Sequence, residues 1–523
     1  MQVTELDTTA VTYINEIKTQ YEQQIHKLKT ELLEYQYKYL QIKERYDLLI
    51  YKRFVRISER LLGDEKQLLL FPVESSENAT APCEDEKQEI SEIKSYSRRK
   101  SGRKPLDPKL PRVEKLLDIP ETEKICCCGA KLTRIGEETS EKLHIIPPRI
   151  YVEKTIRPKY GCRSCEGTTD EQKPAVRIAP VEPAIIARSI VSPSLLSCIL
   201  IQKYEDHLPF YRQEKQFQRI GVRISRQDMS NWQQQAYAKL TPLLDLLQRE
   251  LKSGPVIQMD ETQVQVMGEE GRQDTQKSWM WVARGGPTNR TVVLYTYRET
   301  RAAYHAKALL EGYRGYVQTD GYEAYDAALK GMAGIVHVGC FAHARRKFFE
   351  ASKAVKKPQS AEEGMKYIRK LYFLEDKLRA EGKDEQSFVA ERKSLAGPIL
   401  AQFKAWLLKR SQEVPPNMLL GKAIYYSLSQ WQKMTAYLQS PHLTPDNNGC
   451  ENAIRPFVLG RKNWLFNKSP EGAESSCGMY SLIETAKQNN LIPLNYLTAL
   501  FEKAPFASSQ EDWEKLLPWN IFK

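Results

Sequence analysis

The sequence predicts a multidomain α+β protein: an N-terminal coiled coil, a small cysteine-rich unit, a helical module, and an α/β domain that carries a helical insertion. Three observations lead to this fold class. They are a seven-residue apolar repeat near the N-terminus, five cysteines between residues 126 and 165, and, after residue 253, apolar strands and helices in the order βββαβαβα. A chain of 523 residues is long enough to hold several domains of ordinary size.

The composition is that of a globular protein with a cationic surplus. Lys and Arg number 78 against 66 Asp and Glu, the formal net charge is +12, and 41% of the residues are hydrophobic. Such a surplus favours a polyanionic partner, most often nucleic acid. No run of about 18 apolar residues occurs, and the N-terminal residues lack the pattern of a secretory signal. We therefore expect a soluble, cytoplasmic protein without membrane association or structural disulfides.

Residues 1–62 are predicted to form a coiled coil. Two lines of positions repeat every seven residues, and ten of their twelve members are apolar or aromatic. The seam consists of Ile14, Tyr21, Leu28, Tyr35, Ile42 and Leu49, and of Lys18, Ile25, Leu32, Tyr39, Tyr46 and Arg53. This pattern favours a homo-oligomer held by the seam. A single long helix packed on its own protein is the alternative, because the seam tyrosines are bulky.

Residues 63–110 are predicted to be a linker with a basic stretch. The first part is rich in Ser, Glu, Ala and Pro and has no apolar periodicity. From residue 94 onward cations dominate, as in segments that follow a phosphate backbone or enter a minor groove. The candidate DNA contacts here are Arg98, Arg99, Lys100, Arg103 and Lys104. A solvated run of charge without a ligand is the alternative.

Residues 111–180 have the cysteine pattern of a zinc-ribbon-like unit. Cys162 and Cys165 show the two-residue spacing that usually supplies one arm of a tetrahedral zinc site. The other arm comes from three adjacent cysteines, from which we select Cys126 and Cys128 although the sequence leaves the pair open. Strands are expected within 145–152 and at 155–156. Buried, reduced cysteines are the alternative to structural Zn²⁺.

Residues 181–252 are predicted to form a helical DNA-binding domain. A helix over 207–220, a turn at Gly221 and a second helix capped by Ser225 have the layout of a helix-turn-helix. Arg226, at the start of the second helix, is then a candidate DNA contact. Two helices that only pack together in a core produce the same pattern, so this alternative stays open.

Residues 253–500 are predicted to form an α/β domain. Strands are expected at 256–266, 279–283, 291–295, 316–319 and 335–338. The first three form a meander and the last two alternate with helices, which is the order of the ribonuclease-H-like fold. Helical residues from about 351 to 441 are interpreted as an insertion in this domain, and residues 501–523 as a C-terminal tail.

Three acids of this domain are candidate metal ligands. Asp260 lies on the first strand, Asp320 follows the fourth, and Glu451 lies on a later helix that Asp446 is expected to cap. Two-metal phosphoryl transfer needs carboxylates on adjacent central strands and a further one from a helix. Hard oxygen ligands suit Mg²⁺, or Mn²⁺ in its place. Each acid alone has an ordinary structural explanation, and only the joint pattern favours catalysis.

Basic and aromatic residues around these acids suit phosphate contacts and stacking on distorted bases. The candidate DNA contacts are Arg345, Arg346, Arg455, Arg461, Lys462 and Trp464. Pro456 disfavours helical geometry at Arg455, so the helix is expected to be disturbed there. We expect His343 to be a satisfied structural histidine rather than a residue that positions DNA or metal.

Several stretches together resemble the large subunit of insertion sequence sixty-six family transposases, which are TnpC-type DDE transposases. In chain order they are 102–106, 203–209, 260–262, 320–326, 340–348, 447–456 and 461–466. The resemblance implies that Asp260, Asp320 and Glu451 are the catalytic triad. It also implies that the cysteine pairs are the family's zinc-binding unit, although the cluster at 126–128 is tighter than expected.

The function that this resemblance implies is DNA transposition. Such an enzyme binds terminal inverted repeats, cleaves a strand at each element end with metal-activated water, and joins the freed 3′-hydroxyl to target DNA. Small accessory proteins of the same element are further implied partners, and the bacterial nucleoid is the implied location. A metal-dependent structure-specific nuclease is the closer alternative. A catalytically inert DNA-binding protein is the other, which the complete set of acids disfavours.

Overall fold

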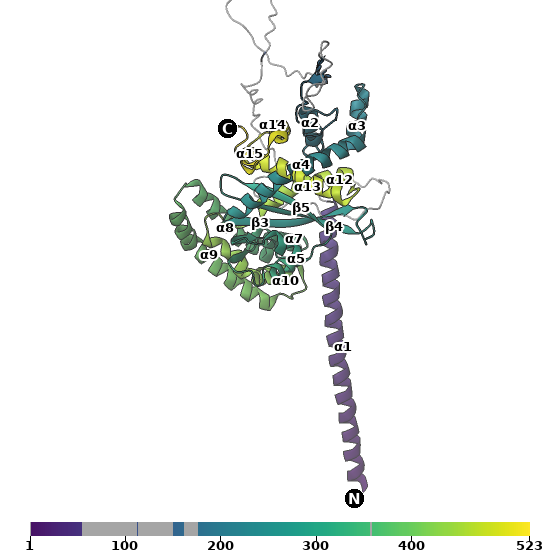
Figure 1. Ribbon diagram of the computed structural model, residues 1–523. Helices are drawn as coiled ribbons and strands as arrows, with labels where there is room; N and C mark the ends of the chain where they lie inside the picture. The colour runs from purple at the N-terminus through teal and green to yellow at the C-terminus, as the bar shows by residue number, and fades with distance from the viewer. Residues whose placement is uncertain (1, 55–111, 113–149, 162–175, 356–357) are drawn as a thin grey trace, which may run out of the picture. The chain divides into compact units, whose positions relative to one another are not determined.

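The computed structural model describes residues 2–54, 112, 150–161, 176–355 and 358–523 (Figure 1). The four cysteines expected to bind zinc, Cys126, Cys128, Cys162 and Cys165, lie outside the described residues. So do the basic-stretch candidates Arg98, Arg99, Lys100, Arg103 and Lys104. Within the described part of the chain, no helix combines the length and apolar character needed to span a membrane.

Helix α1 (Gln2–Phe54) confirms the helix expected at the N-terminus. Its seam positions are exposed in the single chain: Leu28 is 57% and Ile42 66% accessible to solvent. Among the described residues, α1 contacts other elements near its C-terminal end, where Lys52 forms an ion pair with Glu350 at 2.7 Å. The seam positions from residue 18 to residue 53 are not covered by the described part of the chain, and association through them stays a prediction.

A two-stranded antiparallel hairpin, β1 (Lys159–Gly161) and β2 (Val176–Ile178), flanks residues 162–175. The strand expected at 155–156 and the described end of the one expected within 145–152 are wrong, because residues 150–158 have no regular secondary structure. Pro158 lacks a backbone N–H, and the pairing starts only at the residue after it.

The predicted helix pair is confirmed. The helical module consists of α2 (Pro193–Tyr204), α3 (Phe210–Arg219) and α4 (Arg226–Ser253). Gly221 turns the chain between α3 and α4 with a φ of 82°, which favours glycine. Ser225 and Asp228 form a reciprocal capping box at the start of α4, so the exposed Arg226 begins a well-defined helix.

The central sheet has the predicted element order. Its elements are β3 (Val256–Val266), β4 (Lys277–Gly285), β5 (Val292–Arg298), α5 (Ala303–Leu309), β6 (Gly315–Gln318), α6 (Glu323–Leu329), β7 (Ile335–Val338) and α7 (Phe341–Lys353). The strand order is β5-β4-β3-β6-β7. Strands β3, β4 and β5 are antiparallel, whereas β6 and β7 run parallel to β3. The short strand β8 (Phe466–Asn467) pairs with the far end of β3.

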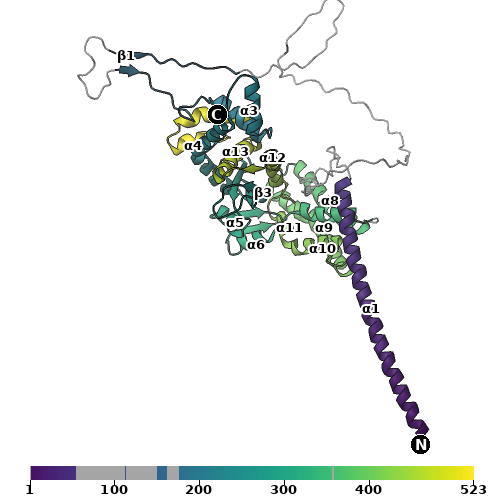
Figure 2. The ribbon, with the colours of Figure 1, turned by 90° about the vertical axis from the view of Figure 1, so that its right-hand side faces the viewer.

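Helices follow in two groups. The first is α8 (Gln359–Ala380), α9 (Glu385–Glu413), α10 (Leu419–Ser429), α11 (Trp431–Thr435) and η3 (Ala436–Gln439). The second is α12 (Asn448–Trp464), α13 (Pro470–Gln488), α14 (Pro493–Lys503), η4 (Ala504–Phe506) and α15 (Gln510–Lys515). The first group confirms the helical character of the expected insertion, and Figure 2 shows α8, α9, α10 and α11 lying together. This group packs with α7 around its own apolar core. In the second, α12 and α13 pack on the sheet (Figure 1).

Two details of the second group differ from expectation. Helix α12 continues through Pro456 without ending, so Arg455 remains helical. Residues 501–523 do not form a tail that leaves the fold, because Phe501, Leu517 and Ile521 are buried in the main core. Apolar side chains at these positions gain more from burial than from exposure to water.

A buried arginine ties the insertion to the segment that precedes α12. Arg392 of α9 has no solvent-accessible surface. It donates to the Glu375 carboxylate at 3.1 Å, to the Leu443 carbonyl at 3.1 Å and to the Ser440 carbonyl. The insertion thus holds residues 440–443 in place through charge-assisted hydrogen bonds.

Replacing Arg392 by Leu should lower the free energy of unfolding by about 2–4 kcal/mol, because the Ser440 and Leu443 carbonyls would lose their buried donor and Glu375 would keep only its ion pair with Arg379. Urea unfolding of the full chain measures this. Arg410→Leu in the same helix is the matched control. Its ion pair with Glu413 is solvent-exposed and should cost less than about 1 kcal/mol. Equal losses in the two variants would contradict the assigned role.

Candidate catalytic and metal-binding site

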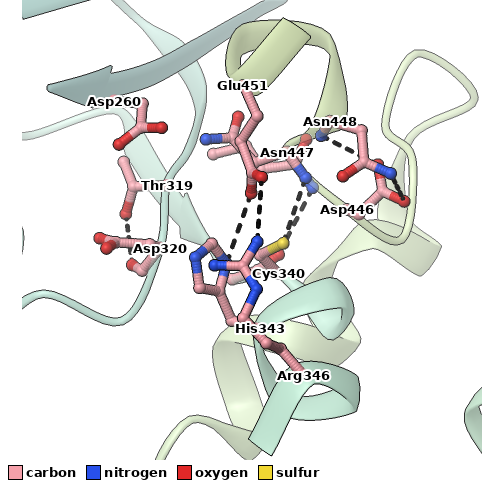
Figure 3. A network of polar contacts seen from close by, with 12 residues as sticks. Asp260, Thr319, Asp320, Cys340, His343, Arg346, Asp446, Asn447, Asn448 and Glu451 are labelled. Carbon is pink, nitrogen blue, oxygen red and sulfur yellow. Dashed lines mark hydrogen bonds and ion pairs between the residues drawn. The ribbon is translucent and has the colours of Figure 1, made fainter. Parts of the chain in front are cut away.

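The two candidate aspartates lie on neighbouring parallel strands. The β3–β6 register pairs Gln258 with Gln318, and Gln258 Nε2 donates to Gln318 Oε1 at 2.9 Å. Asp260 and Asp320 each follow these glutamines by two residues, so they lie beside each other at the carboxyl end of the strand pair. Figure 3 shows both carboxylates on one side of the site, with Glu451 across from them.

The start of α12 brings Glu451 to these aspartates. Asn447, fully buried, donates from Nδ2 to the Met259 carbonyl at 2.9 Å, next to Asp260 in the chain. Asp446 accepts from the Asn448 backbone N–H at 3.0 Å, as expected of a residue that satisfies the helix N-terminus. Gly449 approaches β3 so closely that a Cβ there would lie 2.3 Å from Gln258 Oε1.

Glu451 is surrounded by residues of α7. It is 0% exposed, and Arg346 Nη2 donates to its Oε2 at 3.4 Å. His343 Nδ1 lies 3.7 Å from its Oε1. Cys340 Sγ joins these two in a group whose ligand atoms all lie within 4.8 Å of one another. Glu451 therefore has one oxygen bound by an arginine and one that faces a histidine (Figure 3).

Burial and mutual repulsion shift the ionisation of the site. Burial raises the pKa of Asp260 well above its usual range, and the charges of Glu261, Asp320 and Glu451 raise it further. Burial also raises the pKa of Asp320, against the nearby Arg301. The pKa of Glu451 is raised to about 7 by burial, although Arg346 opposes the shift. The three carboxylates are thus close enough to repel one another.

Glu261, the neighbour of Asp260, has a different role. Successive side chains of a strand point to opposite faces, so Glu261 points away from the face that carries Asp260. Its carboxylate is buried and accepts hydrogen bonds from Arg301 and from the Tyr325 hydroxyl. Arg301 also lies over the Tyr322 ring, 3.5 Å from its centroid. Glu261 is therefore already paired, whereas Asp260 is available to a ligand.

The residues present fit a divalent metal ion. Three carboxylates with raised pKa values converge, and Glu451 Oε1 is a buried oxygen without a hydrogen-bond partner among the described residues. A cation would offset their repulsion and give that oxygen a partner. The pKa of His343 is lowered to about 3 by burial and by Arg346 and Lys347, so its ring is neutral near pH 7. It adds no positive charge to the site.

The candidate DNA contacts fall into two groups. The exposed group consists of Arg226 on α4 and of Arg455 and Lys462 on α12; Arg346 is partly exposed beside Glu451. The other three candidates make contacts within the protein. Arg345 is only 6% exposed and is therefore poorly placed to contact DNA. Arg461 donates to the Gln263 carbonyl and Trp464 packs edge-on against Tyr204, but both remain partly exposed, so DNA contact stays a prediction for them.

Sequence reasoning missed the residues that join the acids to one another. Gln258, Gln318 and Asn447 were not assigned any part in the site, and His343 was expected to be satisfied although its Nδ1 has no hydrogen-bond partner among the described residues. A buried glutamine inside an apolar strand was the available signal. Polar groups in such positions normally need a specific partner.

Comparison with known proteins identifies the family. A sequence profile described as "Transposase IS66 family" matches residues 188–475, more than half of the chain, including Asp260, Asp320 and Glu451. The chain belongs to the IS66 family of transposases. Three further profiles match: "Transposase C of IS166 homeodomain" at 41–114, "zinc-finger binding domain of transposase IS66" at 123–166, and "IS66 C-terminal element" at 481–519.

Relatives match over most of their length. A Sinorhizobium fredii protein named "Uncharacterized protein y4jD" is 31% identical over 423 residues, which cover 79% of this chain and 80% of the relative. "Uncharacterized protein y4qI" from the same organism is 31% identical over 466 residues, covering 86% and 84%. Membership in the IS66 family supports a transposase that binds DNA and contains a structural zinc unit, and it implies a divalent metal.

Gly449→Ala should push the first turn of α12 away from Gln258 and thereby displace Glu451. We expect the transposase to lose about 1–3 kcal/mol of stability and to bind Mn²⁺ more weakly, as measured by thermal unfolding and calorimetric titration. Gly397→Ala in α9 is the matched control, since nothing lies within 4 Å of the added methyl group. Unchanged Mn²⁺ binding in Gly449→Ala would contradict the role given to this close approach.

The raised pKa of Glu451 predicts how stability depends on pH when no divalent ion is added. Its usual pKa is about 4.3, and about 7 in the fold. The folded state therefore favours the protonated form of Glu451. The stability that this protonation contributes is fully present below about pH 4 and is lost as the pH rises through 7. Glu451→Gln should be more stable than the unmodified chain by about 3–4 kcal/mol at pH 8 and similar to it at pH 4. Thermal unfolding at both pH values measures the difference, and an equal difference at both would contradict it.

Proposed function

We propose that the protein is a DDE DNA transposase whose catalytic residues are Asp260, Asp320 and Glu451. In this proposal it binds the terminal inverted repeats of an insertion sequence, hydrolyses a strand at each end, and transfers the freed 3′-hydroxyl to target DNA. The observation that carries the proposal is the convergence of the buried carboxylate of Glu451 on α12 with the partly buried carboxylates of Asp260 on β3 and of Asp320 after β6.

The proposed chemistry divides between metal and protein. Mg²⁺ or Mn²⁺, held by the three carboxylates, would supply the positive charge that activates the attacking oxygen and stabilises the leaving one. Asp260 and Asp320 are fixed relative to each other by the β3–β6 ladder. Arg346 holds Glu451 through one oxygen and leaves the other facing the site. This arrangement needs no nucleophilic Ser or Tyr and therefore no covalent protein–DNA intermediate.

We also propose that the sheet domain is ribonuclease-H-like. The support is the strand order β5-β4-β3-β6-β7, with three antiparallel strands followed by two parallel ones. In this arrangement the first and fourth strands of the domain are neighbours, which explains why acids about sixty positions apart belong to one site. The helices α8–α11 form the insertion between the second and third acids.

DNA binding is proposed for several parts of the chain. The exposed side chains of Arg226, Arg455 and Lys462 offer cations for phosphate contacts. The zinc unit with Cys126, Cys128, Cys162 and Cys165, and the basic stretch before it, would add contacts to transposon ends. Self-association through the α1 seam would bring two active sites to the two ends of one element.

Asp260→Asn, Asp320→Asn and Glu451→Gln should each reduce cleavage of element ends by roughly a thousandfold or more, because removing one carboxylate weakens metal binding by several kcal/mol. Binding to end DNA should stay nearly unchanged. The assay is cleavage and joining of DNA that carries the element's own ends, with Mg²⁺ and with or without the element's accessory proteins. Asp326→Asn is the matched control, since this acid lies on α6 and pairs with Lys433. Retained cleavage removes the residue from the triad, and cutting without joining favours a nuclease.

The seam of α1 predicts an oligomer. Leu28→Lys together with Leu32→Lys should lower the mass measured by light scattering toward the 60.4 kDa of one chain, because charged side chains cannot pack in the seam. Gln23→Lys with Thr30→Lys, on the outer face of the same helix, is the control and should keep the larger mass. If both double variants have the same mass, association lies elsewhere.

A further inference from the structure

Two buried atoms in the candidate site face each other without a hydrogen bond. His343 Nδ1 and Glu451 Oε1 are 3.7 Å apart, which is too long for a hydrogen bond. Neither has a hydrogen-bond partner among the described residues, and the Glu451 side chain is only 1% exposed. Buried polar atoms of native proteins nearly always have a partner, so we expect a bound group to lie between these two atoms.

The separation suits two ligands of one ion. Nitrogen and oxygen ligands lie about 2.0–2.2 Å from a divalent transition ion, which places two neighbouring ligand atoms roughly 3–4 Å apart. A water molecule between these two atoms would need further polar partners. The other oxygen of Glu451 is not free to act as one, because it already accepts a hydrogen bond from Arg346.

Cys340 lies beside His343 and Glu451, but its sulfur already has a hydrogen-bond partner. Its Sγ accepts the Asn447 backbone N–H at 3.3 Å, and burial raises the pKa of the thiol well above its usual range. A neutral thiol is a poor metal ligand. Its hydrogen bond instead ties the start of α7 to the start of α12. The Phe341 N–H reinforces this tie by donating to the Pro445 carbonyl at 2.9 Å, and so His343 and Glu451 are held in fixed positions.

We propose that His343 is a further ligand, through a ring nitrogen, of the divalent ion that Glu451 holds. This inference rests on the proposed metal site of Asp260, Asp320 and Glu451 and adds one nitrogen to a set of oxygen ligands. Imidazole suits transition ions better than Mg²⁺. The site should therefore bind Mn²⁺ more tightly than Mg²⁺, and His343 should account for much of the difference.

Pulsed electron paramagnetic resonance of the full chain loaded with Mn²⁺ tests this, because a directly bound imidazole produces ¹⁴N modulation. We expect the modulation in the unmodified protein and its loss in His343→Ala, together with a roughly tenfold or larger loss of Mn²⁺ affinity. His442→Ala, at an exposed histidine whose partner is Glu385, is the control and should keep both the modulation and the Mn²⁺ affinity. His343→Gln replaces His343→Ala if the alanine variant does not fold. Absence of the modulation in the unmodified protein, or its persistence in both His343 variants, would overturn the assignment.

Carboxylate variants separate this inference from the proposed function. If Mn²⁺ binding weakens in Asp260→Asn and Glu451→Gln but no nitrogen modulation occurs, the metal site stands and only the role of His343 fails. If Mn²⁺ binding is the same in these variants as in the unmodified chain, the proposed metal site itself fails. Both readouts are independent of DNA cleavage.

Discussion

The candidate site depends on a buried network of side-chain amides beneath the acids. Gln258 and Gln318 pair across the parallel strands, Gln318 also donates to the Thr444 carbonyl at 2.8 Å, and Asn447 donates to the carbonyl of Met259. All three side chains are almost fully buried. In a low-dielectric interior these hydrogen bonds are rigid, because breaking any one of them leaves a buried polar group unpaired. It fixes the three segments that carry Asp260, Asp320 and Glu451.

This rigidity is used to hold groups that repel one another. Loss of hydration raises the pKa values of all three carboxylates, and repulsion by neighbouring acids raises those of Asp260 and Glu451 further, so without a cation the ionised forms destabilise the fold. Two contacts limit the free-energy cost of this repulsion. Arg346 binds one oxygen of Glu451, and Glu261, which would add a fourth charge, is turned to the opposite face and bound by Arg301. The remaining repulsion favours a divalent ion, so instability and metal affinity have the same origin.

The helical insertion contributes to the site from outside it. Helices α8–α11 have their own apolar core with α7, and Arg392 extends from α9 to the carbonyls of residues 440 and 443. This segment leads directly to Asp446 and α12. The same insertion packs against α7, which supplies His343 and Arg346 and is preceded by Cys340. Both helices around Glu451 are therefore positioned by elements far from β3 in the sequence.

The sequence by itself determined the local features: the helix of α1, the capped start of α4, the order of strands and helices in the α/β domain, and the acids that stand on them. These follow from apolar periodicity, capping residues and turn residues, which act over a few neighbouring positions. Tertiary structure alone decided which charged residues are internal, as with Arg345 and Arg392, and which atoms meet, as with His343 and Glu451. Gln258 and the Asp446 carbonyl, 188 positions apart, are brought to 3.4 Å. Contacts of this kind depend on how whole elements pack, and no local pattern in the chain records them.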